Sequence, residues 1–277
     1  LPNGTEGFRP VIGTGNDVLD VAKGEKKNPD GYTGFPSGLW WIKDMANANQ
    51  HQLVTNAFSA QNPVWVMPQS NPGWANYSQP TGNSIAWCWS APDDFSADGS
   101  GGSQWSVPCT GKINTAAGFS IIKWSIDTQE EVTLAHGLGK TPEFYVFAQN
   151  RGTTSSTNAS NKYTWHKDLT PGNYNYLDLD NAQTTNNFAG VIGDYPTQDI
   201  FYVGNAFPGG RGDFLAFLWT SIPGYSSFGS YTGNGSADGP LIYTGFKPAF
   251  VLTKSVGSGN WVINDSSRNP YNPVNSV

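Results

Sequence analysis

Three similar stretches recur along the chain, and this repeat constrains the fold more than any other feature of the sequence. They read YTGFPSGLWWIK at 32–43, HGLGKTPEFYVFAQNR at 136–151 and YTGFKPAFVLTK at 243–254. Each contains a proline that leads into an apolar run: Pro36, Pro142 and Pro248. A regular recurrence of this kind indicates a chain made of copies of one structural unit.

The copies share an order of features and define three units. An apolar strand with a glycine turn opens each copy, a short strand ending in a glycine corner follows, and the proline-led strand comes next. The first two copies then close on matching apolar strands, SIAWCW from Ser84 and FLAFLW from Phe214. We predict a first unit at 1–117 with a long insertion near its end, a second at 118–223 with an expanded middle loop, and a partial third at 224–277.

The partial third unit needs a partner, because half a β unit exposes an apolar sheet face and an unpaired strand edge. Three resolutions are open. The chain continues past Val277, the half unit packs on the second copy, or a neighbouring chain completes it. We expect the first of these.

The local pattern predicts an all-β fold. Apolar runs of five to seven residues are bounded by Gly, Pro and Asn, and no helical period extends over eleven residues or more. We therefore predict tandem β-sandwich, jelly-roll-like repeat modules of about 100 residues. Only NDVLDVAKGEKK at 16–27 and KDMANANQHQLV at 43–54 have helix-friendly compositions, and we expect at most one helical turn in either.

Charge and hydropathy exclude two classes of partner. The formal net charge is -6 and the pI is about 4.9, and Lys and Arg form no cluster that would bind phosphates, so we expect no nucleic-acid partner. No apolar run approaches the roughly 18 residues of a membrane helix, and the first residues lack a signal-peptide layout, so we expect no membrane insertion.

Several stretches resemble a known family. GFSIIKW, VTLAHGLGKTPEFYVF and the segment from GSYTGNGSADGP to NPYNPVN are similar to repeated β modules in large virion proteins of marine tailed phages, chiefly cyanophages, described as tail-fibre or structural proteins. The resemblance covers most of the chain from about Phe8, although the first copy departs from it in VIGTGNDVLDVAKGEKKNPDGYTGF. It implies a virion protein on the particle surface, with other virion proteins as partners and a possible homotrimer. It implies no biochemical activity.

Residues with catalytic or metal-binding chemistry are few. The three histidines, His51, His136 and His166, lack metal-ligand spacing, and we predict no metal and no cofactor. His136 precedes a glycine corner, which favours a structural role. Acidic candidates for a glycosidase are weak, and YLDLDN, with Asp178 and Asp180, reads as a strand whose acids face water.

Two further polar features have ordinary explanations. PDDFSADGSGG resembles a calcium loop but lacks the ligand spacing of an EF-hand, so a flexible polar loop is the better interpretation. Cys88 reads as a small buried thiol inside an apolar strand. A disulfide with Cys109 stays an open alternative.

Aromatic residues divide into two groups. Those at equivalent strand positions of different copies are predicted to form the core: Trp40, Trp87, Trp89, Phe144, Phe217 and Trp219. Others lie in non-repeating stretches among Asn, Gln, Ser and Gly, where flat rings with neighbouring amides are suited to grip sugars: Trp65, Trp74, Tyr77, Trp105, Tyr163, Tyr174 and Tyr176. The alternative is that these rings pin long loops onto the sandwich. Trp165 and Trp261 sit near the same relative place in their copies, which favours the core for both.

The sequence as a whole favours a non-enzymatic virion structural protein, a tail-fibre or appendage segment that contacts host-surface glycan. The alternative is a capsid decoration or head-fibre protein without glycan recognition. A polysaccharide-degrading enzyme is a minor third hypothesis.

Overall fold

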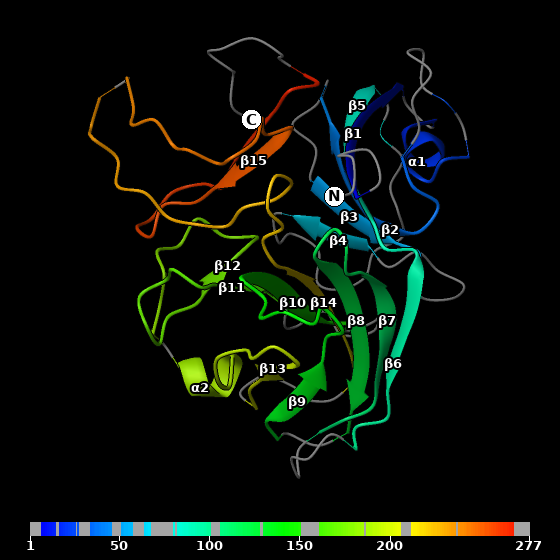
Figure 1. Ribbon diagram of the computed structural model, residues 1–277, viewed down its shortest axis with the longest axis vertical. Helices are drawn as coiled ribbons and strands as arrows, with labels where there is room; N and C mark the ends of the chain where they lie inside the picture. The colour runs from blue at the N-terminus through cyan, green and yellow to red at the C-terminus, as the bar shows by residue number, and fades with distance from the viewer. Residues whose placement is uncertain are drawn as a thin grey trace.

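The computed structural model of the chain consists almost entirely of short antiparallel strands, which confirms the all-β prediction. The residues described are 7–14, 17–25, 27, 34–45, 51–57, 64–67, 80, 82–100, 106–127, 130–150, 161–185, 187–205, 212–236 and 238–268. Within these ranges the strands form two large sheets and two smaller strand pairs (Figure 1).

Sheet A contains the first five strands in the order β1-β5-β2-β3-β4, with every pair antiparallel. The strands are β1 (Phe8–Thr14), β2 (Gly38–Asp44), β3 (His51–Thr55), β4 (Val64–Met67) and β5 (Asn83–Ser90). One face is covered by helix α1 (Asp17–Ala22), whose Val18 and Val21 pack in one cluster with Trp40 and Ile42 of β2. These apolar side chains explain why so short a helix is stable, since packing rather than length holds it in place.

Sheet B contains seven strands in the order β12-β11-β10-β14-β8-β7-β6. They are β6 (Asp93–Ala97), β7 (Cys109–Asn114), β8 (Phe119–Ile126), β10 (Phe144–Asn150), β11 (Tyr163–His166), β12 (Asn175–Tyr176) and β14 (Gly212–Trp219). Its outer face is covered by the pair β9 (Val132–Ala135) and β13 (Ile200–Val203), together with the one-turn helix α2 (Phe188–Val191). We call the apolar cluster beneath this cover the outer core.

The two sheets repeat one strand arrangement in the same register. The order β1-β5-β2-β3-β4 of sheet A matches β8-β14-β10-β11-β12 of sheet B. In sheet A, Trp89 lies between Phe8 and Leu39; in sheet B, Trp219 lies between Phe119 and Phe144. The repeat seen in the sequence is therefore also a repeat of strand order and pairing.

Sheets A and B pack against each other through equivalent faces. Trp89 and Trp219, which hold equivalent positions, contact each other with ring centroids 6.0 Å apart. The apolar cluster between the sheets, which we call the shared core, has these buried members: Leu39, Trp41, Leu53, Ile85, Trp87, Ala91, Phe119, Ile121, Phe144, Val146, Ala148, Leu177, Leu215, Phe217, Trp219 and Ile263. Five of the predicted core aromatics are thus confirmed in this cluster, with Trp89 half-buried at its edge, and the sixth, Trp40, is buried beneath α1.

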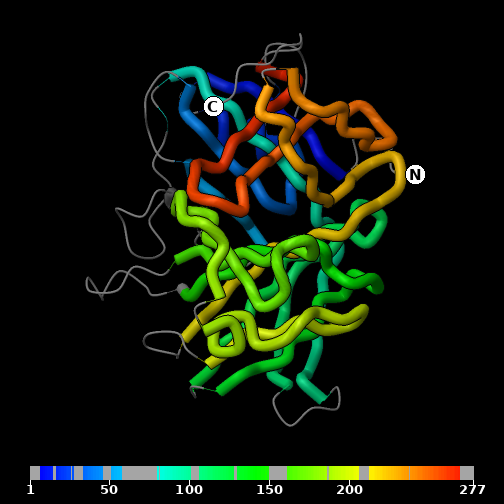
Figure 2. The backbone as a smooth tube through the Cα atoms, turned by 90° about the vertical axis from the view of Figure 1, so that its left-hand side faces the viewer, coloured from blue at the N-terminus to red at the C-terminus, as the bar shows by residue number. Residues whose placement is uncertain are grey.

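The third unit contributes a hairpin to the same core. Strands β15 (Phe250–Thr253) and β16 (Val262–Asp265) pair antiparallel, and the Phe250 ring lies 5.6 Å from Phe8 and 5.3 Å from Trp89. Figures 1 and 2 accordingly show the orange C-terminal segment beside the blue strands of sheet A, with the green strands of sheet B at the other end. Each of the three repeated prolines lies two residues before a strand, β2, β10 or β15.

The predicted boundary at 117/118 falls between two paired strands. Residues Cys109–Asn114 of β7 pair with Phe119–Ile126 of β8 inside sheet B. The long insertion assigned to the first unit therefore supplies β6 and β7 to the second sheet. Pairing between neighbouring hairpin strands is favoured by the short Asn114–Gly118 turn, but nothing in the repeat pattern signals it.

Two local expectations are wrong. Helix α1 has six residues and exceeds the single turn expected at 16–27, whereas residues 51–55 of the other helix-friendly stretch form strand β3, because Leu53 and Val54 fill buried positions opposite β2. The predicted polar loop at 93–98 is mostly edge strand β6, in which Phe95 packs on the outer core while Asp94 faces water and pairs with Lys112 at 2.7 Å. Charged residues facing outward from an edge strand are a common protection against aggregation.

Candidate functional site

The three tyrosines predicted to contact a glycan in the second unit lie together at one edge of sheet B. Pairing of β11 with β12 places Tyr163 opposite Tyr176, with ring centroids 5.4 Å apart. Tyr174 lies 6.0 Å from Tyr163 and 5.5 Å from Tyr176, and its hydroxyl is 3.2 Å from that of Tyr176. The sequence prediction therefore identified residues that the fold brings together.

Two of these rings have no open face. Tyr163 is 9% exposed and Tyr174 is 2% exposed, and Tyr163 also stacks on Phe147 at 5.6 Å. Burial, helped by the hydrogen bond with Tyr176, raises the pKa of the Tyr174 hydroxyl above its ordinary value. Because a sugar stacks on an exposed ring face, the glycan prediction is wrong for Tyr163 and Tyr174: both pin the loop onto the outer core. Tyr176 is half-buried.

The structure describes only one of the four glycan-contact candidates of the first unit, and only its backbone. The backbone of Trp65 lies in β4 opposite Leu53 of β3. Trp74, Tyr77 and Trp105 lie outside the described residues. A glycan-binding role for these four residues stays a prediction.

An exposed aromatic that the sequence analysis did not select lies in the same expanded loop. Tyr195 is 44% exposed, and its ring packs edge-on against Trp165 at 6.2 Å and against Phe188 of α2 at 5.5 Å. The backbone N–H of Gly172 donates a hydrogen bond of 2.8 Å to its hydroxyl. Tyr195 meets the criterion used for the other candidates, an aromatic in a non-repeating stretch, so the signal was present in the sequence.

Two amide side chains lie in the loop whose Gly172 holds the Tyr195 hydroxyl. Asn173 follows Gly172, is 7% exposed, and its Oδ1 has no hydrogen-bond partner within the described part of the chain. The amide of Gln183 fixes the same loop, accepting from the Thr170 N–H at 3.1 Å and donating to the Thr170 hydroxyl at 2.9 Å. Because the Asn173 amide oxygen is buried and the Gln183 amide bonds to Thr170, the exposed face of the fixed Tyr195 ring is the part of this loop that can stack on the C–H face of a sugar.

One acidic candidate is buried rather than exposed. Asp178 is 6% exposed, and its Oδ2 lies 3.4 Å from the Nζ of Lys162, which is itself 3% exposed. Its Oδ1 accepts a 3.1 Å hydrogen bond from the backbone N–H of Lys162. The interpretation that Asp178 faces water is therefore wrong, whereas Asp180 is exposed as expected. A carboxylate held in a closed ion pair serves the fold.

His136 has the structural role that was predicted. It is fully buried; its Nδ1 accepts from the Leu138 N–H at 3.2 Å, and its Nε2 lies 3.3 Å from the Thr197 carbonyl. Burial lowers the pKa of His136 to about 4, so the ring is neutral at pH 7 with its proton on Nε2. Among the residues that the structure describes, no group of three or more His, Cys, Asp or Glu side chains could hold a metal ion.

The cysteines are separate free thiols. Cys88 in β5 and Cys109 in β7 are both buried and unpaired, which decides against the disulfide alternative. Burial raises the pKa of Cys109 to about 11, so the reactive thiolate is scarce at neutral pH.

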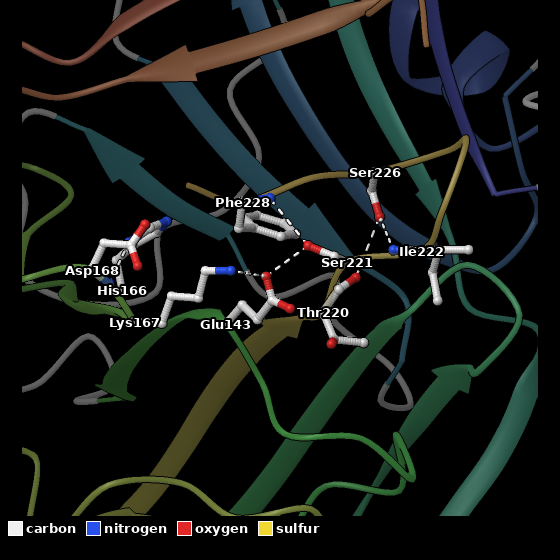
Figure 3. A network of polar contacts seen from close by, with 9 residues as sticks. All are labelled: Glu143, His166, Lys167, Asp168, Thr220, Ser221, Ile222, Ser226 and Phe228. Atoms are coloured by element: carbon white, nitrogen blue, oxygen red, sulfur yellow. Dashed lines mark hydrogen bonds and ion pairs between the residues drawn. The ribbon is translucent and has the colours of Figure 1, made fainter. Parts of the chain in front are cut away.

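A polar junction joins sheet B to the start of the third unit (Figure 3). Glu143, just before β10, accepts a 2.6 Å hydrogen bond from the Ser221 hydroxyl and pairs with Lys167 at 2.9 Å. The Phe228 N–H donates to Ser221 Oγ at 3.2 Å. Burial opposes ionisation of Glu143, but these hydrogen bonds outweigh it and lower the pKa of the carboxyl. The junction fixes the direction in which the chain leaves β14.

The architecture defines the class of the protein: an all-β chain in which one antiparallel strand arrangement is used twice and packed face to face. Residues 42–277 match the DUF7483 family, described as a domain of unknown function, and the chain belongs to this family. No match was found among curated proteins or among solved structures. No helix in the described ranges is long and apolar enough to cross a membrane.

Proposed function

We propose that this chain is a structural protein of a phage particle, a tail-fibre or appendage segment made of tandem β-sandwich, jelly-roll-like modules and exposed on the virion surface. The observation that carries the proposal is the repeated sheet: sheets A and B share order and register, and the β15–β16 hairpin begins a third copy on the same core. Units that bury a continuous core by stacking suit an elongated, rigid body. The resemblance to virion proteins of tailed phages supports the same proposal.

A glycan contact is proposed at the expanded loop of the second unit. Tyr195 offers an exposed and fixed ring, and Tyr176 is half-buried on the adjoining strand. Each contact would be weak alone. A particle that presents many copies, as a trimer or a larger assembly with other virion proteins, gains avidity through effective concentration.

The second candidate is a capsid decoration or head-fibre protein that recognises no glycan. It is favoured by the burial of Tyr163 and Tyr174, which removes two of the seven aromatics predicted for sugar contact. Both candidates are virion proteins, and they differ in whether the loop surface binds sugar.

Location in the particle tests the shared part of the proposal. We expect the chain in purified virions by mass spectrometry, and antibodies against it should label the particle surface in electron micrographs. Label on the tail supports the appendage, and label on the head supports decoration. Absence of the chain from purified virions would overturn both.

Glycan binding separates the two candidates. Multimerised wild-type chain is applied to an array of host-surface glycans, alongside Tyr195→Ala and the control Tyr231→Ala, whose tyrosine is 57% exposed elsewhere. We expect Tyr195→Ala to weaken binding at least about tenfold and the control to bind as wild type. Wild-type chain that binds no glycan would leave decoration as the function.

A further inference from the structure

The third unit leaves apolar side chains exposed where the first two units bury theirs. Leu241 is 96% exposed and Tyr243 is 91% exposed. Of the eight large hydrophobic residues that are exposed among those described, six fall between residues 231 and 256: Tyr231, Leu241, Ile242, Tyr243, Val251 and Val256. Such a concentration of exposed apolar surface marks an interaction site.

The second unit shows what is missing. Pro142 and Pro248 are 106 positions apart (248 − 142), and the same separation relates Phe144 to Phe250 and Tyr145 to Val251. In sheet B, β10 lies between β11 and β14. In the third unit, β16 takes the place of β11, and no described strand pairs with the other edge of β15.

The outer face of β15 also lacks the cover that its counterparts have. Tyr145 of β10 and Trp40 of β2, at equivalent positions, are both 0% exposed in the outer core and beneath α1, whereas Val251 is 39% exposed. Sheets A and B fill the edge that no described strand occupies at β15 with apolar strands of eight residues, β5 (NSIAWCWS) and β14 (GDFLAFLW). Strands β5 and β14 therefore show which kind of strand would fit beside β15: about eight residues long and apolar.

The segment leading to the hairpin does not supply this cover. The 106-residue offset relates β9, which pairs with β13 in the second unit, to residues 238–241, which form no strand and are exposed.

We propose that the open edge of β15 binds an extended polypeptide strand of the β14 kind, about eight residues long and apolar on both faces. The strand would pair antiparallel with β15, place one face over the shared core beside Phe250 and Leu252, and set the side chains of its other face next to Val251. Main-chain hydrogen bonds supply affinity and the side chains on each face supply specificity, as in other cases of strand addition. This proposal does not depend on the proposed function.

The experiment adds a peptide to the 277-residue chain. The probe carries residues 212–220, GDFLAFLWT, flanked by lysines for solubility, and its binding is followed by fluorescence anisotropy. Hydrogen exchange of the chain is measured with and without the probe. Two control peptides are N-methylated at alternate amides, one at the odd-numbered residues and one at the even-numbered residues. Both keep every side chain, and main-chain pairing with β15 is blocked only in the one whose methyl groups face β15.

We expect saturable binding, slower exchange of the β15 amides, and loss of binding by the control peptide whose methyl groups face β15. Val251→Asp should weaken binding at least about tenfold, whereas Met45→Asp, at a residue also 39% exposed, should not. The N-methyl comparison keeps the test valid if Val251→Asp folds poorly.

Three results would overturn the proposal. The probe fails to bind, or it binds without slowing exchange of the β15 amides, or both methylated peptides bind as well as the probe. Sedimentation of the chain alone adds a fourth: a dimer that already protects β15 would make a second copy the occupant.

Discussion

At the scale of single residues, buried His136 makes the fold sensitive to acid. Its pKa lies at about 4 in the folded chain against 6.5 for a free side chain, so between these pH values the unfolded chain binds a proton at this residue and the folded chain does not. The contribution of neutral His136 to the free energy of unfolding is therefore fully present above pH 6.5 and declines as the pH drops towards 4. Since one pKa unit corresponds to about 1.4 kcal/mol, this residue can account for a loss of about 3 kcal/mol.

The test is urea unfolding of wild type and His136→Gln at several pH values between 7 and 4. Glutamine can still accept the Leu138 N–H and does not titrate, so the variant should lose less stability over this range than wild type. Its slope should not vanish, because burial lowers the pKa of His51 to about 4 as well. Equal slopes in both proteins would contradict the assignment.

The ion pair between Lys162 and Asp178 gives a second prediction. Both side chains are nearly inaccessible to solvent, so Asp178→Ala leaves an uncompensated charge in the interior and should cost about 3–5 kcal/mol of unfolding free energy. The double variant Lys162→Met with Asp178→Leu should recover most of this loss, because the pair gains little over apolar residues of similar volume. Additive losses in the double variant, measured by urea denaturation, would contradict it.

These residues show how far sequence reasoning reaches. Repetition at equivalent strand positions correctly placed Trp40, Trp87 and Phe217 in the core, because apolar strands must bury a face. The same reasoning failed for Asp178 and Tyr174, since their burial depends on loops that fold back over sheet B and that have no counterpart in the other copies. Burial by a non-repeating loop produces no pattern in the sequence that recurs between copies, so it cannot be predicted from the repeat.

At the scale of elements, the β15–β16 hairpin should depend on one side chain. Phe250 packs among Phe8, Trp89 and Trp87 and is half-buried, so Phe250→Ala should loosen the hairpin by about 3 kcal/mol, the low end for such a truncation. Hydrogen exchange should speed up in β15 and β16 and stay unchanged in β7 and β8. The control, Val251→Ala on the opposite face, should have little effect. If exchange accelerated uniformly throughout the chain, the hairpin would open only together with the rest of the molecule, which would contradict the prediction.

Elements were predicted better than their partners. Short apolar runs bounded by turn residues located β2, β5, β8, β10, β14 and β15, since each run reflects local geometry. The assignment of β6 and β7 to the first unit failed because pairing across the Asn114–Gly118 turn depends on which sheet has a free edge at β8. That information is not local. Helix α1 is longer than one turn because apolar contacts with sheet A extend it.

At the scale of the whole molecule, the shared core joins all three predicted units. Equivalent faces of sheets A and B meet at Trp89 and Trp219, and the hairpin adds Ile263 to the same cluster. Units that share one core lose their largest apolar interface when separated, so the repeat describes sequence and strand order without implying independent folding. This arrangement differs from a chain of self-contained modules joined by linkers.

Fragments test that difference. Residues 118–223, the second unit as bounded by the repeat, lack β6 and β7 and expose Phe119, Phe144 and Phe217. We expect this fragment to be insoluble or unfolded by circular dichroism. A longer fragment, 91–223, restores the missing strands but still exposes the shared core, and we expect it to aggregate or self-associate through that face. Cooperative unfolding of monomeric 91–223 with the stability of the whole chain would contradict the role assigned to the shared core, because burial of that face would then contribute nothing.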